Sequence, residues 1–196
     1  MARPSAVYRV IGYASRPLQF LYRIEARGFE NLPRDRGFVL AANHVSNFDP
    51  WVLGLPLFPQ RFLRFMAKSE LFWWPLGLVV EGAGAFMVRR GTGDLDAIET
   101  AVELVRTGEI VVMFPEGTRR RKGLVKKREA RPHTGAARIA HGADAPLVPA
   151  AVKGTDRLVR LAKLRVAYGR PLEAGDDLHE TTERLMAEIR RLYETL

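Results

Sequence analysis

The chain alternates short apolar runs with longer segments in which apolar residues recur every three or four positions. Phe38 to Ala42 is a short apolar run that ends at Asn43, and it predicts a buried strand that leads into a loop. The run at 110–117 is apolar almost throughout, as in strands buried on both faces of a parallel sheet. Further strands are predicted at residues 61–68, 85–90, 146–154 and 164–169.

The clearest helix is predicted over residues 93–109. Its apolar residues Ile98, Ala101, Val102 and Val105 share one face, and Gly108 follows its end. A second amphipathic helix is predicted over residues 176–196, where the apolar stripe is formed by Leu178, Leu185, Ile189 and Leu192. Shorter helices are predicted at residues 50–57 and 134–142.

This alternation of strands and helices predicts a single α/β domain with a mainly parallel central sheet flanked by helices. Ligands of such sheets bind beyond the carboxyl ends of the strands. Three polar segments follow predicted strands: residues 43–49 (NHVSNFD), 88–91 (VRRG) and 114–120 (FPEGTRR). We therefore expect these segments to meet at one edge of the sheet.

Residues 1–24 are expected to form an amphipathic helical segment able to associate with a membrane, and residues 25–196 to form the main domain. The longest apolar run, 71–80, is interrupted by Pro75 and falls short of the ~20 residues that span a bilayer. Aromatic residues crowd the stretch 51–74, where they fit an interfacial surface, an acyl channel or ordinary core.

Positive charge is concentrated in one segment of this 196-residue chain of net charge +9. Residues 119–131 hold eight basic residues against one acid, a net charge of +7. Such a patch suits phosphates on lipid headgroups, nucleic acid or a small molecule, and it equally fits a solvated loop. The absence of cysteine excludes disulfides, thiolate metal sites and a cysteine nucleophile.

His44 and Asp49 are the first candidate catalytic residues. A histidine whose tautomer is held by a carboxylate is a suitable general base at neutral pH. The spacing of five brings the two together if His44 lies in the loop and Asp49 at the start of the next helix. The same residues also fit a purely structural role, because Asp49-Pro50 is a strong N-cap and N1 pair and Ser46 with Asp49 matches a capping box.

The segment from Phe114 to Arg119 is the second candidate. Gly117 permits a tight turn with close approach of a ligand, Thr118 can donate a hydroxyl, and Arg119 offers a fork suited to a phosphate. Glu116 would repel an anion, so it is better suited to binding a hydroxyl group or to holding the arginine side chains in place. A surface turn with a glutamate salt bridge is the alternative.

In the third segment, strand alternation places Arg89 and Arg90 on opposite faces, so only one of them can point into a shared site. No serine-hydrolase elbow, clustered metal-ligand spacing, Walker loop or complete dinucleotide fingerprint is present in the sequence.

The order of these motifs resembles the 1-acylglycerol-3-phosphate O-acyltransferases, also called lysophosphatidic acid acyltransferases. The resemblance covers roughly residues 25 to 170, and its first and third blocks are specific and complete. The matching blocks are Asn43-His44-Val45-Ser46-Asn47-Phe48-Asp49, Gly84-Ala85-Phe86-Met87-Val88-Arg89-Arg90, Phe114-Pro115-Glu116-Gly117-Thr118-Arg119 and Val148-Pro149-Ala150.

The resemblance implies a glycerol-3-phosphate acyltransferase-like fold and a peripheral enzyme on the cytoplasmic face of the membrane. It implies acyl transfer from acyl-CoA or acyl carrier protein to the free hydroxyl of lysophosphatidic acid, giving phosphatidic acid, with no metal or bound cofactor. His44 would be the general base and Asp49 would orient it. The residues implied to hold the acceptor are Arg90, Glu116, Gly117, Thr118 and Arg119.

Two alternatives stay open from the sequence. Related enzymes acylate other lysophospholipids or glycerol 3-phosphate, and the sequence does not choose among these acceptors. The basic segment 119–131 would also suit a non-catalytic module that binds membranes or nucleic acid, although no nucleic-acid partner is expected.

Overall fold

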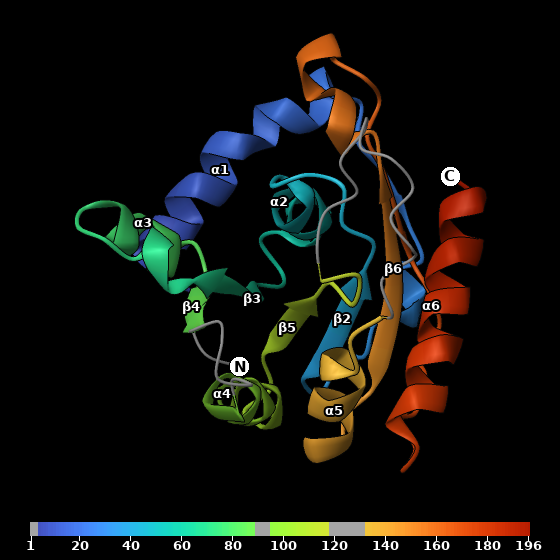
Figure 1. The fold of residues 1–196 in the computed structure, drawn as a ribbon. Coiled ribbons are helices and arrows are strands. Elements are labelled where there is room, and N and C mark those ends of the chain that lie inside the picture. The colour runs from blue at the N-terminus through green and yellow to red at the C-terminus, as the bar shows by residue number, and fades with distance from the viewer. Residues whose placement is uncertain (1–3, 89–94, 118–131) are drawn as a thin grey trace, which may run out of the picture.

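The computed structural model describes residues 4–88, 95–117 and 132–196 (Figure 1). Within these ranges one seven-stranded sheet has the order β1-β7-β6-β2-β5-β3-β4. The strands are β1 (Glu25–Arg27), β2 (Phe38–Ala42), β3 (Leu63–Lys68), β4 (Ala85–Val88), β5 (Ile110–Met113), β6 (Leu147–Lys153) and β7 (Arg165–Tyr168). The helices are α1 (Ala6–Leu21), α2 (Asp49–Gly54), α3 (Leu76–Gly82), α4 (Leu95–Arg106), α5 (Gly135–Gly142) and α6 (Leu178–Glu194).

The sheet is parallel at every paired strand except β6 and β7, which are antiparallel. The predicted α/β class with a mainly parallel sheet is confirmed. β2 lies in the middle, between β5 and β6. Because these three strands are parallel, the segments that follow them begin at the same edge of the sheet.

Alternation along β2 supplies both faces of the core. Phe38, Leu40 and Ala42 face a cluster that includes Val52 and Leu53 of α2. Val39 and Ala41 face the opposite cluster, to which α4, α5 and α6 contribute (Figure 1). All five residues of β2 are fully buried, which is why this segment reads as one continuous apolar run.

Asn43 extends the pairing of β2 with β6 through its side chain. Its Nδ2 donates to the carbonyl of Val152 at 2.9 Å, and its Oδ1 accepts the Val152 N–H at 2.8 Å. The side-chain amide thus takes the place of a peptide group in the ladder and satisfies a buried strand position. The main chain is released to turn away at His44.

Several elements differ from the sequence-based expectation. The predicted 110–117 strand ends at Met113, and residues beyond it turn. The helix predicted over 50–57 is split into α2 and a 3₁₀ turn, η2 (Leu55–Leu57). Strand β1 and helix α3 were not predicted. β1 has only three residues and α3 begins within the apolar run that contains Pro75, so neither gives a clear periodic pattern.

Further 3₁₀ turns are η1 (Phe29–Asn31), η3 (Ser69–Leu71) and η4 (Thr155–Arg160). Among the described helices, none combines the length and the hydropathy needed to cross a bilayer. Helix α1 packs against η2 and α3, on the side of the sheet away from α6 (Figure 1).

We expect Asn43→Ala to lower the free energy of unfolding by about 2–4 kcal/mol, because each buried backbone group left without a partner costs about 1–3 kcal/mol. Urea denaturation measures this loss. The exposed Asn47 gives a matched control, and Asn47→Ala should stay within about 0.5 kcal/mol of the parent. Equal stability of the two variants would show that the Asn43 side chain does not hold the strands together.

Candidate active site

His44 and Asp49 form a direct side-chain contact at the carboxyl end of β2. His44 Nδ1 lies 2.8 Å from Asp49 Oδ2, and Asp49 is fully buried whereas the His44 side chain keeps 16% of its exposure. Asp49 Oδ2 also accepts the N–H groups of Val45 at 2.7 Å and Ser46 at 2.8 Å. An oxygen that already accepts two amides acts as acceptor for the third contact as well, so His44 Nδ1 carries the proton.

The prediction that Asp49 is the N-cap of the following helix is wrong. Helix α2 begins at Asp49 itself, with Phe48 in the N-cap position, and the carboxylate makes no cap bond to its own helix. It turns back to the preceding loop instead. Only half of the Ser46–Asp49 capping box is present: the Ser46 N–H donates to Asp49 Oδ2 at 2.8 Å. Ser46 Oγ accepts the Phe48 N–H at 3.3 Å, and the Asp49 N–H donates to the Ser46 carbonyl at 3.2 Å.

The motif that begins at Phe114 contacts the His44–Asp49 loop through an aromatic ring. Phe114, which follows β5, stacks on the His44 imidazole with ring centroids 4.1 Å apart and an angle of 21° between the planes. The two segments adjoin because β5 pairs directly with β2. The stack fixes the plane of the imidazole in addition to its Nδ1 contact, and Nε2 is the nitrogen left for chemistry.

A tight turn follows Phe114. The Gly117 N–H donates to the Phe114 carbonyl at 3.0 Å, and Gly117 has a φ of +67°, in the region that favours glycine. His133 closes this turn: its N–H donates to the Pro115 carbonyl at 2.9 Å, and a Cβ on Gly117 would lie 2.4 Å from its ring. No local sequence pattern predicts this contact, because His133 reads as part of a polar loop.

An apolar cavity of ≈ 310 Å³ opens beside the His44–Asp49 loop. Phe48 and Trp51 line it from the loop and α2, Ile11 lines it from α1, and Phe65 lines it from β3. Tyr8 also contributes, and its hydroxyl accepts the Leu63 N–H at 3.0 Å. Burial raises the pKa of Tyr8, so its hydroxyl stays neutral.

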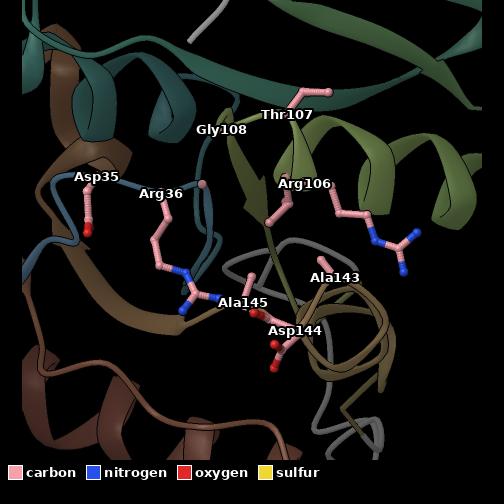
Figure 2. Close-up of a pocket in the computed structure, with 10 residues that line it drawn as sticks. Asp35, Arg36, Arg106, Thr107, Gly108, Ala143, Asp144 and Ala145 are labelled. Carbon is pink, nitrogen blue, oxygen red and sulfur yellow. Dashed lines mark hydrogen bonds between the residues drawn. The ribbon is translucent and has the colours of Figure 1, made fainter.

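A second cavity, of ≈ 430 Å³, lies at the opposite edge of the sheet, where the strands begin (Figure 2). There Arg36 donates to the carbonyl of Asp144, and Arg106 donates to the carbonyl of Gly142 at 2.5 Å. Both carbonyls lie at the end of α5, so these arginines cap a helix terminus. Their role is structural, and the cavity is remote from His44.

Comparison with known proteins places the chain in a family. A model of the family named Acyltransferase matches residues 23–153, which include the His44–Asp49 loop and the whole turn after β5. This chain belongs to the acyltransferase family. The 1-acyl-sn-glycerol-3-phosphate acyltransferase of Bacillus subtilis is 37% identical over 173 residues, 85% of this chain and 83% of that protein.

Two further comparisons extend the likeness. A lyso-ornithine lipid O-acyltransferase from Pseudomonas aeruginosa is 43% identical over 79 residues, 39% of this chain and 29% of that protein. The crystal structure of the 1-acyl-sn-glycerophosphate acyltransferase PlsC from Thermotoga maritima matches with a TM-score of 0.73 at 23% identity. The match covers 94% of this chain and 77% of that one, and it shows the shared fold.

The structure of the acyltransferase thus brings together His44, Asp49, Glu116 and Gly117 at one edge of the sheet. The other predicted site residues, Arg90, Thr118 and Arg119, lie outside the described residues, as do Arg89 and the basic segment 119–131. The Val148-Pro149-Ala150 block is a buried part of β6 next to β2. In the described part of the chain, no three His, Cys, Asp or Glu side chains are grouped as a metal site.

We expect Gly117→Ala to lower the stability of the acyltransferase by about 1–2 kcal/mol, the cost of a left-handed conformation in a residue with a Cβ. The new methyl group would also push His133 away from the turn. Thermal unfolding measures the loss. Gly135→Ala is the control, because a Cβ there meets only the ends of two side chains, Met113 at 3.4 Å and Ile98 at 3.8 Å, and α5 should tolerate it. Similar stability of both variants would contradict the need for glycine at 117.

Proposed function

We propose that this acyltransferase moves an acyl group from acyl-CoA or acyl carrier protein to the free hydroxyl of lysophosphatidic acid, giving phosphatidic acid. The named activity of the Bacillus relative supports the acceptor. The observation that carries the chemistry is the His44 ring, held at Nδ1 by Asp49 and on one face by Phe114. An imidazole fixed in this way presents Nε2 as a general base.

In the proposed reaction His44 Nε2 takes the proton of the acceptor hydroxyl. The hydroxyl oxygen attacks the carbonyl carbon of the thioester at the same time. The tetrahedral intermediate then expels the thiolate as the carbon–sulfur bond breaks, and the imidazolium returns the proton to sulfur. Asp49 stabilises the imidazolium between these steps. A thioester is already activated, so the reaction needs neither an enzyme nucleophile nor a bound cofactor.

The acceptor phosphate is proposed to lie at the turn after β5. Gly117, with its φ of +67°, forms the tight turn, and Arg90, Thr118 and Arg119 supply the donors that a phosphate requires. Glu116 is half-buried at the same turn, where it would bind a hydroxyl group or hold the arginine side chains in place. The turn lies beside Phe114 and therefore beside His44.

The acyl chain is proposed to occupy the apolar cavity between α1, α2 and β3. Its aromatic walls, Trp51, Phe58 and Phe65, come from the stretch that the sequence left open between channel, interface and core. Phe48, one residue before Asp49, lines the cavity as well, so the chain would enter next to the reacting carbonyl.

We also propose that the enzyme works at the cytoplasmic face of a membrane, with no nucleic-acid partner. Trp73 and Trp74 are 61% and 79% exposed beside α3, and such aromatic residues favour the interface of a bilayer. Helix α1, which forms one wall of the acyl cavity, adds exposed apolar residues next to them.

A second acceptor is favoured by the likeness to a lyso-ornithine lipid O-acyltransferase over 79 residues. The His44 chemistry would be the same, and another lysolipid headgroup would lie at the turn after β5. A panel of lysolipids and glycerol 3-phosphate, each tested with both acyl donors, separates the two possibilities.

Replacement of His44 tests the proposed function. We expect His44→Ala to slow the release of thiol from acyl-CoA with lysophosphatidate by about 10²–10⁴-fold, the usual contribution of a general base. Vesicle binding should be unchanged. His179→Ala, at an exposed position on α6, is the matched control and should keep parental activity. A folded His44→Ala protein with near-parental transfer would remove the general-base role.

A bulky residue in the cavity should shift the preference toward shorter acyl chains. Ile11→Trp narrows the cavity from α1, and each methylene that no longer fits forfeits about 0.8 kcal/mol of burial. Competition between acyl donors of different length measures the preference. Val10→Trp is the control because Val10 is 66% exposed on the outer face of α1. The same profile in both variants would place the acyl chain elsewhere.

A further inference from the structure

Helix α1 has an apolar outer face. Its inner side is formed by Tyr8 and Ile11 at the cavity and by the buried Gly12 and Ser15. On the opposite side Val10, Tyr13, Phe20 and Leu21 are exposed by 66%, 55%, 84% and 50%. A helix on a water-facing surface normally carries polar residues there, so this face is suited to an apolar partner.

The basic residues of this segment lie along one flank of that face. Arg9 and Arg16 are seven residues apart within α1, a spacing that places side chains on one stripe of a helix. The first 24 residues contain no aspartate or glutamate. An apolar face bordered by arginines is typical of helices that lie in the plane of an anionic lipid surface.

A second group of exposed apolar side chains lies in and just after η4. Val159 is 100% exposed and Leu161, just after the turn, is 47% exposed. Leu161 has a φ of +48°, an unfavourable conformation for a residue with a Cβ. Arg157, which lies 3.7 Å from the carboxylate of Asp156, and Arg160 are exposed on either side of Val159. The fold therefore holds an apolar tip between two cations in water.

This tip adjoins the end of α1. The Leu164 N–H donates to the Tyr22 carbonyl at 3.1 Å, which ties the segment after η4 to the residue after α1. Leu158 of η4 packs against the same core cluster as Tyr22. Figure 1 shows η4, in orange at the top, next to the end of the blue α1.

The tip also lies at the edge of the sheet that carries His44. η4 follows the carboxyl end of β6, and β6 pairs in parallel with β2 so that Ala150 lies opposite Ala42. A surface that touches both the tip and α1 would therefore hold the His44 edge close to it.

We propose that the η4 tip, Val159 to Leu161, inserts into an anionic lipid bilayer and forms one docking surface with the outer face of α1. This inference rests on the proposed function, which places a lipid acceptor at the His44 edge. Val159 and Leu161 enter the interface, and Arg157 and Arg160 lie against lipid phosphates. Contact at both the tip and α1 holds the His44 edge of the sheet toward the lipid.

A single fluorescent label tests the contact. The chain has no cysteine, so Val159→Cys provides one attachment point for a nitrobenzoxadiazole dye. The label should shift to the blue and brighten with vesicles of phosphatidylcholine and phosphatidylglycerol, and respond less to phosphatidylcholine alone. The matched control is Ala187→Cys, at an exposed position on α6, on the other side of the molecule (Figure 1). Its label should not respond.

A negative charge at the η4 tip should weaken the binding of the protein to anionic vesicles. Val159→Asp is expected to lower vesicle partition by roughly tenfold, in line with the burial of one valine side chain, and Val159→Ile should retain it. Because Val159 is fully exposed, neither change should alter thermal unfolding.

Three outcomes would overturn the proposal: a silent label at 159 on protein that sediments with vesicles, equal responses at 159 and 187, or no vesicle binding at all. Acyl transfer to acceptor dispersed in detergent is measured in parallel. Transfer without a response at 159 rejects the docking tip and leaves the proposed function standing. A response at 159 without transfer rejects the proposed function alone.

Discussion

One carboxylate oxygen, Asp49 Oδ2, determines the shape of the loop on which the rest of the site depends. It gathers the N–H groups of Val45 and Ser46 together with His44 Nδ1. The bonds to the amides fold the loop, and the bond to the ring sets the tautomer. Asp49 is fully buried, so these bonds are shielded from water. The same oxygen therefore serves local structure and the proposed proton transfer.

The sequence predicted much of this arrangement because its signals are local. The apolar run at Phe38–Ala42 and the periodicity around Ala101 and Val105 identify buried elements directly, and both are found. Parallel strands then imply that residues after β2 and β5 meet. The His44–Asp49 contact is also compatible with chain geometry, since the four residues between them let the chain fold back.

Other features depend on contacts between distant segments. The stacking of Phe114 on His44 depends on the register between β2 and β5, which no local sequence pattern specifies. The contact of His133 with Gly117 depends on the path of the chain back to α5. The N-cap assignment of Asp49 failed because a single carboxylate can satisfy either its own helix or the preceding loop. The competing donors here, Val45, Ser46 and His44, become visible only when the loop is folded.

The side chain of Asn43 has a consequence for the dynamics of the site. The amide hydrogen of Val152 is bound by this side chain rather than by a neighbouring strand. Its exchange with solvent therefore requires the first residue of the NHVSNFD motif to leave β6, whereas its neighbours in β6 are protected by the sheet itself. The exchange rate at Val152 thus reports how often the loop that carries His44 opens, separately from the unfolding of the protein.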